Sequence, residues 1–343
     1  MQAIQWQNGL VTFIDQTKLP HTEEYITTSD YNVIIEAIKK LRIRGAPLIG
    51  IAAAYGVALA CLELQRKKSQ NYLVDLKIII EEFKNTRPTA VNLFWALDRV
   101  AKFVSPLSDI DSVTNNIINE AIKIHTEDKL MCESIGKLGN QIVPEKANIL
   151  THCNTGALAT GGEGTALAII KYAQKAGKKI NVFVDETRPL LQGARLTTWE
   201  LMKAGINCTL ITDNTAAFLL QQKKVDLILT GADRVTINGF AANKIGTYNL
   251  AVLAKFHNIP FYIAVPSSSI DLDIDKPEQI IIEERNPDEV RKIKDLYISP
   301  ETVNVYNPSF DITPPELITG IITENNVYRY PYQPEFYKLK SSE

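Results

Sequence analysis

Hydrophobic residues follow two different spacings along this chain, and the spacing changes near residue 140. From Ser29 to about Asn140 the apolar residues recur every three to four positions, as in YNVIIEAIKKL, GIAAAYGVALACLEL, TAVNLFWALDRVAKFV and SVTNNIINEAIKIH. This spacing is typical of helices with one buried face. Residues 1–28 instead form short extended patterns that break at Asn8-Gly9, a favoured hairpin turn. We therefore predict a mainly helical N-terminal domain, residues 1–140, with a small antiparallel sheet.

Residues 141–343 contain short apolar runs that alternate with helical patterns. The runs are ANILTHC, INVFVDE, INCTLIT, VDLILTGAD and PFYIAVP. Uninterrupted apolar runs suit strands buried on both faces of a parallel sheet, and regular alternation with helices predicts right-handed βαβ units. Two of the helical patterns end in Ala-Gly, at Gly177 and Gly205, as helices often do. The predicted fold class is α/β, with residues 141–343 forming a doubly wound parallel sheet domain.

Charge and composition limit the kinds of molecule that this protein can bind and the compartment in which it functions. The 343 residues include 37 basic and 39 acidic side chains, so no excess of positive charge is available to neutralise a nucleic acid backbone. The N-terminus lacks the pattern of a secretory leader, and no run approaches the ~18 apolar residues of a membrane span. The four cysteines lack the spacing of a disulfide scaffold. We expect a cytoplasmic protein with free thiols that binds neither nucleic acid nor membrane.

The loops that follow the predicted strands are rich in polar residues and glycine. In an open parallel sheet, ligands bind outside the carboxyl ends of the strands, so these loops are the candidate site. The stretch THCNTGALATGGEGTA can present backbone N–H groups to a phosphate, or it can be a tight turn. Its glycines match neither the dinucleotide-binding fingerprint nor a Walker loop, although Asp185 fits the acidic position of the former.

Two strand ends carry groups suited to proton transfer. Cys153 leaves its strand between His152 and Asn154, where a thiol beside a helix N-terminus can become a nucleophile or proton carrier. Packing is the more common role of a cysteine. Asp233 follows the apolar strand VDLILT, where a partly dry carboxyl group suits general acid–base work; an Asx turn or N-cap is the alternative. The histidines show no metal-binding spacing, so we expect no metal.

Several cations lie next to glycine-rich turns, which suits phosphate binding, although any one of them can be a solvated surface charge. Arg44, Gly45 and Ala46 form one such turn, Arg87 lies in the same half of the chain, and Lys244 follows Asn243 downstream of Asp233. Together with the strand-end loops, these residues indicate a small phosphorylated substrate.

Six ordered segments resemble the methylthioribose-1-phosphate isomerase family, which is related to regulatory subunits of a translation-initiation exchange factor. They are IRGAPLIGIAAAYG, TRPTAVNLFWAL, THCNTGALATGGEGTA, DETRPLLQGARLTTWEL, GADRVTINGFAANKIGTYNLAVLAK and IEERNPDEV. The resemblance implies that residues 141–343 form a Rossmann-like catalytic domain. It also implies a homodimer that isomerises a sugar phosphate without a cofactor. It implies that Cys153 and Asp233 are catalytic. It also implies a set of substrate-binding residues: Arg44, Gly45, Ala46, Arg87, Gln192, Asn243 and Lys244.

The implied reaction converts 5-methylthioribose 1-phosphate, a cyclic aldose derivative, into the open-chain ketose 5-methylthioribulose 1-phosphate. Our hypothesis is that Asp233, protonated because it is partly buried, donates a proton to the ring oxygen while Cys153 assists hydrogen transfer. Whether that hydrogen moves as a proton or a hydride stays open. The alternatives are a ribose-1,5-bisphosphate isomerase, a non-catalytic regulatory subunit and an NAD-dependent dehydrogenase.

Overall fold

The computed structural model describes residues 2–87, 90–104 and 109–340, and there the mixed α/β fold expected from the sequence is confirmed. The chain divides into two compact units. The N-terminal unit comprises residues 1–133 and 157–164, and the C-terminal unit comprises residues 134–156 and 165–343. The domain boundary placed after residue 140 from the sequence stays a prediction.

The N-terminal unit combines a small sheet with helices. Strands β1 (Ile4–Gln7), β2 (Leu10–Ile14) and β3 (Tyr25–Thr28) form an antiparallel sheet in that order. The predicted hairpin turn is confirmed, because Asn8 and Gly9 both adopt positive φ between β1 and β2. The helices are α1 (Tyr31–Lys39), α2 (Ala46–Lys67), α3 (Tyr72–Lys84), α4 (Val91–Ala101) and α5 (Ile110–Asn140).

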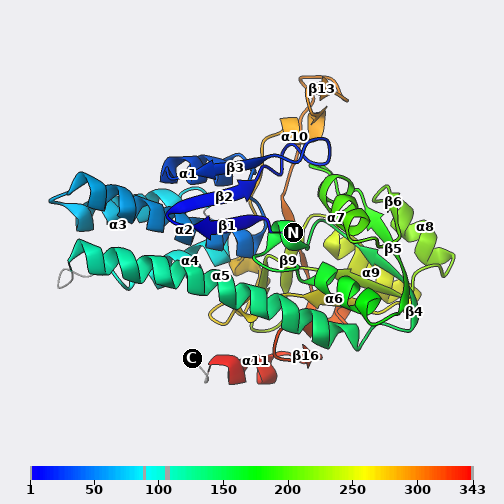
Figure 1. The fold of residues 1–343 in the computed structure, drawn as a ribbon. Coiled ribbons are helices and arrows are strands. Elements are labelled where there is room, and N and C mark those ends of the chain that lie inside the picture. The colour runs from blue at the N-terminus through cyan, green and yellow to red at the C-terminus, as the bar shows by residue number, and fades with distance from the viewer. Residues whose placement is uncertain (1, 88–89, 105–108, 341–343) are drawn as a thin grey trace. The chain divides into compact units, whose positions relative to one another are not determined.

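Helix α2 forms the centre of this unit, where it packs against α1, α3 and α4 (Figure 1). It is long and apolar enough to cross a membrane, but most of its residues are buried inside the protein. Apolar residues surround this helix instead of forming one stripe, which is typical of the core helix of a globular protein.

A buried histidine of α5 forms a hydrogen bond with the glycine-rich segment 157–164. The hydroxyl of Tyr55 lies 2.7 Å from Nδ1 of His125, and Nε2 of His125 lies 3.0 Å from the carbonyl oxygen of Gly161. Because a carbonyl only accepts hydrogen bonds, Nε2 carries the proton and Nδ1 accepts from Tyr55. Burial lowers the pKa of His125, which agrees with a neutral ring. These two hydrogen bonds therefore hold the buried side chain of His125 in one tautomer.

Replacing Tyr55 by Phe is expected to lower the free energy of unfolding by about 1–3 kcal/mol, because it leaves Nδ1 of His125 buried without a donor. Urea denaturation of the purified protein measures this change. Tyr25→Phe is the matched control, since Tyr25 is exposed and should tolerate the same loss of a hydroxyl. Equal stability of the two variants would contradict this assignment.

The C-terminal unit is built around a seven-stranded sheet with the spatial order β16-β15-β10-β7-β4-β5-β6. All neighbouring strands are parallel except β15 and β16. The five predicted strands are all present in this sheet: β4 (Lys146–Thr151), β5 (Lys179–Asp185), β6 (Cys208–Ile211), β7 (Leu227–Thr230) and β10 (Phe261–Ala264). Two strands not predicted complete it: β15 (Gly320–Ile322) and β16 (Val327–Tyr328).

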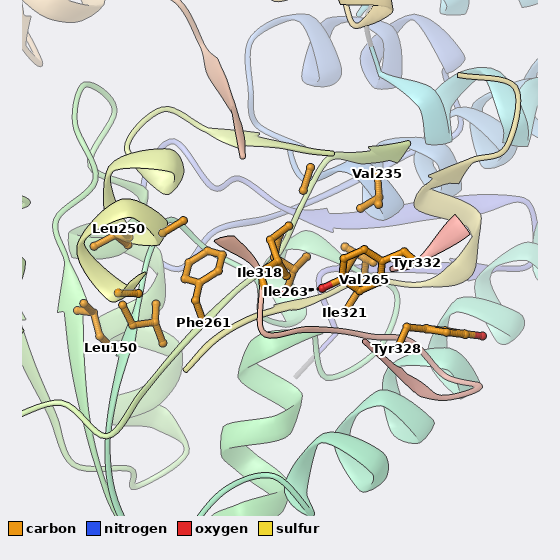
Figure 2. Packing of buried hydrophobic residues seen from close by; sticks show 14 of the residues in the cluster. Leu150, Val235, Leu250, Phe261, Ile263, Val265, Ile318, Ile321, Tyr328 and Tyr332 are labelled. Atoms are coloured by element: carbon orange, nitrogen blue, oxygen red, sulfur yellow. Dashed lines mark hydrogen bonds between the residues drawn. The ribbon is translucent and has the colours of Figure 1, made fainter. Parts of the chain in front are cut away.

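Both faces of this sheet are covered by apolar side chains. Along β7, Ile228 contributes to one core cluster, whereas Leu227 and Leu229 contribute to the other. The first cluster includes side chains of α8 (Thr215–Gln221) and α9 (Thr247–His257), and Figure 2 shows part of it around Phe261. The second includes α6 (Ala166–Lys175) and α7 (Thr198–Lys203). Burial on both faces explains why the strands have uninterrupted apolar sequences.

A second sheet was missed from the sequence. The segment read as a single loop after β7 contains β8 (Arg234–Thr236) and β9 (Ala241–Lys244), so that interpretation was wrong in part. These strands pair with β11 and β14 in the order β11-β8-β9-β14. The short strands mix polar and small residues, so their sequence lacks the usual strand signal. The remaining strands and α-helices are β11 (Ile270–Asp271), α10 (Asp288–Arg291), β12 (Lys292–Ile293), β13 (Leu296–Tyr297), β14 (Phe310–Thr313) and α11 (Gln333–Lys340).

Candidate active site

The sheet order places two candidate catalytic residues at adjacent strand ends. Counted in chain order, the six parallel strands have the spatial order 3-2-1-4-5-6, so the direction of winding reverses between β4 and β7. Ligands of such sheets bind in the crevice outside the carboxyl ends at this reversal. Thr151, the last residue of β4, pairs in register with Leu229 of β7. Cys153 and Asp233 follow these two strands, one on each side of the reversal.

Cys153 occupies a constrained backbone conformation. Its φ is +60°, a region that costs a non-glycine residue energy and is enriched at functional sites. Its N–H donates to Oγ1 of Thr187 at 2.8 Å, and its carbonyl accepts from Oγ1 of Thr197 at 2.6 Å. Only 7% of Cys153 is exposed. Thr187, just after β5, and Thr197, the last residue of a π-helix (Gly193–Thr197), thus hold the backbone of this cysteine on both sides.

The other three cysteines lie within helices or strands. Cys61 is fully buried in α2, Cys132 in α5, and Cys208 is half-buried in β6. Burial raises the pKa of each of these thiols, so they stay protonated and unreactive at neutral pH. Cys153 therefore differs in position from the other three cysteines, because it follows the end of a strand whereas they lie within a helix or a strand.

Asp233 lies half-buried at the start of the β8–β9 hairpin. Its N–H donates to the carbonyl oxygen of Ala242 at 2.9 Å, so the ladder of this hairpin sets the position of its backbone. The hairpin also carries Asn243 and Lys244 at the end of β9, and both are buried. The second sheet therefore combines a carboxyl group, an amide and an ammonium group in one short segment.

Three of the substrate-binding residues implied by the resemblance belong to the C-terminal unit, and all three are buried. Asn243 donates through Nδ2 to Oγ1 of Thr247 at 2.9 Å. Lys244 donates through Nζ to the carbonyl oxygen of Ser309 at 2.8 Å and lies 4.7 Å from the ring centroid of Phe310. Oε1 of Gln192 is buried without a hydrogen-bond partner. A buried polar atom of this kind is available to a ligand.

The other implied binding residues lie in the N-terminal unit. Gly45, with φ of +99°, precedes Ala46, the first residue of α2, and Arg44 lies immediately before them. The backbone N–H groups at the start of a helix favour anions. Arg87 is the last described residue before a short gap. Phosphate binding by the stretch THCNTGALATGGEGTA, residues 151–166, stays a prediction.

A buried histidine beside Cys153 was not singled out from the sequence. His152 lies 2.9 Å through Nδ1 from Oδ2 of Asp185 and 2.9 Å through Nε2 from the carbonyl oxygen of Ile245. Burial raises the pKa of Asp185 to about 6, although His152 pulls it down. Two sequence features could have indicated this pair: His152 is adjacent to Cys153, and β5 ends in the polar residue Asp185. The hydrogen bond between them depends on which strands are neighbours in the sheet.

His152, Asp185 and Asp213 lie close enough together to resemble a metal site. Asp213, however, accepts backbone hydrogen bonds on both oxygens, from Thr187 at 2.8 Å and Arg188 at 2.8 Å. His152 is bonded on both ring nitrogens. These bonds give the cluster a structural role, because they hold the loop after β5 in place. We call His152, Asp185 and Asp213 the brace. The acidic position expected of a dinucleotide site, Asp185, is part of this brace.

Position 193, directly after Gln192, has room only for glycine. A Cβ atom at this position would lie 1.7 Å from the carbonyl oxygen of Asp185, a backbone atom that cannot move aside cheaply. We expect Gly193→Ala to lower the free energy of unfolding by at least about 2 kcal/mol. Gly177→Ala is the comparison, because Gly177 has open space around it and its φ of +85° costs only about 1 kcal/mol. Urea denaturation distinguishes the two, and a smaller loss for Gly193→Ala would contradict the prediction.

Comparison with known proteins identifies relatives across the whole chain. Residues 42–328 match the model of the Initiation factor 2 subunit family. A methylthioribose-1-phosphate isomerase of Heliobacterium modesticaldum is 52% identical over 334 residues, with 97% of each chain covered. One from Carboxydothermus hydrogenoformans is 52% identical over 341 residues, with 99% of each chain covered.

Two solved structures are also similar over nearly their full lengths. The crystal structure of 5-methylthioribose 1-phosphate isomerase from Pyrococcus horikoshii has a TM-score of 0.91 at 43% identity, covering 100% of this chain and 96% of that one. That of translation initiation factor eIF-2B, subunit delta, from A. fulgidus has a TM-score of 0.85 at 40% identity, covering 98% and 99%. The first of these proteins is an isomerase and the second is a translation initiation factor subunit.

Proposed function

This chain belongs to the Initiation factor 2 subunit family, and from its identity to full-length isomerases we infer that it is a methylthioribose-1-phosphate isomerase. It converts 5-methylthioribose 1-phosphate into 5-methylthioribulose 1-phosphate, a step of methionine salvage. The inferred substrate agrees with the polar strand-end loops and with the buried ammonium group of Lys244.

The catalytic residues that we propose are Cys153 and Asp233. The observation that supports them is the adjacency of β4 and β7 at the reversal of the sheet, because each residue follows one of these strands. The strained backbone of Cys153 adds support, since such strain persists where the surrounding structure holds it in place.

We propose that the substrate-binding residues include Gln192, Asn243 and Lys244 in the C-terminal unit. A buried ammonium group and two amide side chains supply charge and directed hydrogen bonds for a phosphate and sugar hydroxyls. For the N-terminal unit we propose the same role for Arg44, Gly45, Ala46 and Arg87.

The chemistry must open a ring whose anomeric carbon carries a phosphate ester. Asp233 donates a proton to the ring oxygen, and the bond between that oxygen and C1 breaks. The hydrogen on C2 then moves to C1, as a hydride or through removal and return of a proton by Cys153. The C2 hydroxyl becomes the ketone, and its proton returns to Asp233, so no net proton or electron is consumed.

We further propose that the enzyme is a cytoplasmic homodimer, in which a Rossmann-like domain at residues 141–343 follows a mainly helical domain at residues 1–140 in the sequence. Light scattering on the purified protein measures its mass in solution, which for a dimer is twice the 38.3 kDa of the chain.

Incubation of the purified protein with 5-methylthioribose 1-phosphate tests the inferred activity. Proton NMR should show the anomeric signal of the substrate disappear as the ketose forms. Ribose 1,5-bisphosphate is tested in parallel, because turnover of the bisphosphate alone would favour the other sugar-phosphate isomerase. Absence of turnover of either sugar, together with binding to a translation initiation factor, would favour the non-catalytic regulatory alternative.

A further inference from the structure

His152 links the strand end before Cys153 to the strand end that carries Asn243 and Lys244. Its ring contacts Asp185 through Nδ1 and the carbonyl oxygen of Ile245 through Nε2, both at 2.9 Å. Ile245 directly follows Lys244. The side chain is 1% exposed, so the two bonds form away from water. One imidazole ring therefore connects three segments: the ends of β4 and β5 and the turn after β9.

The backbone around this turn is shaped to receive the ring. A Cβ atom at Gly246 would lie 2.9 Å from Cε1 of His152, so a larger residue would push the ring away. Asp311 on β14 accepts from the N–H groups of Gly246 at 2.7 Å and Tyr248 at 3.0 Å, which fixes the turn from its other side. The turn is held between His152 and Asp311.

When Asp185 is ionised, both bonds form only if the ring carries a proton on each nitrogen. The Ile245 carbonyl only accepts, and an ionised Asp185 also only accepts, so both ring nitrogens must donate. Burial alone would lower the pKa of His152, but the hydrogen bond and negative charge of Asp185 outweigh it and raise the pKa above its ordinary value. Other charged groups act on the same ring: Asp213 after β6 raises its pKa, and His152 lowers the pKa of Asp311. Lys244 is the nearby cation that also lowers the pKa of Asp311.

We propose that His152, paired with Asp185, is a positioning residue for the isomerisation: it sets the distance between the Cys153 loop and the turn that follows Asn243 and Lys244. It acts through these residues and has no contact with substrate in this role. The proposal rests on the proposed function, because it assigns the proton carrier to one linked segment and the substrate-binding groups to the other.

Replacement of His152 by Gln removes one of the two bonds, since a single amide cannot reach both partners. We expect kcat/KM to fall about 10- to 100-fold, because small errors in the relative position of reacting groups have effects of this size. Both kcat and KM should change, since both segments are released. Tyr332→Phe is the matched control: it removes a buried 2.8 Å hydrogen bond to the Ile318 carbonyl in the same unit (Figure 2) and should leave both constants unchanged.

Replacement of Asp185 by Asn gives the sharper test. Its companion is Asp185→Leu, which removes the hydrogen bond to Nδ1 of His152, so kcat/KM should fall about as far as in His152→Gln. The amide of Asp185→Asn can instead donate to Nδ1 of a neutral ring, whose Nε2 proton still bonds to the Ile245 carbonyl. We therefore expect Asp185→Asn to keep a kcat/KM at least about 10-fold above that of Asp185→Leu. Melting temperatures of both variants separate a loss of positioning from a loss of folding.

The outcomes separate this proposal from the inferred activity. Wild-type protein without turnover would remove the proposed function. With an active wild type, a His152→Gln variant of unchanged kcat/KM would overturn the positioning role. So would equal kcat/KM values for Asp185→Leu and Asp185→Asn in folded protein. If His152→Gln does not fold, the comparison of these two variants decides alone.

Discussion

Replacing Asp233 by Asn is expected to lower kcat by about 10³-fold, because the amide has the shape of the carboxyl group but no acidic proton for the ring oxygen. The N–H of Asp233 and its bond to the Ala242 carbonyl remain, so the β8–β9 hairpin should form as before. Thermal unfolding and circular dichroism verify the fold, and proton NMR of the ketose product gives the rate. Binding of substrate should persist, since the buried Asn243 and Lys244 are untouched.

Asp226 supplies the matched control. It lies directly before β7, at the opposite end of the strand that leads to Asp233, and accepts the N–H of Asn148 at 2.7 Å. Asp226→Asn makes the same chemical change far along the strand from the carboxyl end. We expect its kcat to equal that of wild type. A wild-type rate in Asp233→Asn would remove the assignment of this carboxyl group as the acid.

Replacing Cys153 by Ser is expected to lower kcat at least about 100-fold, because a hydroxyl is far less acidic than a thiol and transfers a proton poorly at neutral pH. The side chain changes by one atom. Both backbone bonds, to Thr187 and Thr197, stay available, so the strained loop should keep its conformation. Steady-state kinetics with 5-methylthioribose 1-phosphate measure the loss, and a melting temperature close to that of wild type excludes unfolding as its cause.

Cys208→Ser is the control for this substitution. Cys208 lies half-buried in β6, in the same unit, with a thiol whose pKa is raised by burial. It should keep full activity. Labelling with a thiol reagent adds a second readout: substrate should protect Cys153, and a labelling rate unaffected by substrate would argue against its place in the site.

The periodicity of apolar residues was sufficient to predict the five strands, because a buried strand and an amphipathic helix leave different local patterns. The polar β8–β9 hairpin was missed for the same physical reason. Its pairing partners are distant segments, β11 and β14, and its own residues carry little apolar signal. The local sequence indicates which residues of a segment are buried in the core. This hairpin instead pairs with the edges of other strands, which the local sequence does not indicate.

By itself the sequence determined which loops carry the candidate chemistry, since Cys153 and Asp233 follow apolar runs whatever the order of the strands. Only the tertiary structure decided that these runs are neighbours. Strand order depends on how crossover connections pack against each other across the whole unit, and β4 and β7 are separated by two strands and three helices in sequence. The bonds from His152 to Asp185 and Ile245 follow from that packing, because they join groups 33 and 93 residues apart. No local pattern encodes such distances, so the brace beside Cys153 became visible only in the folded chain.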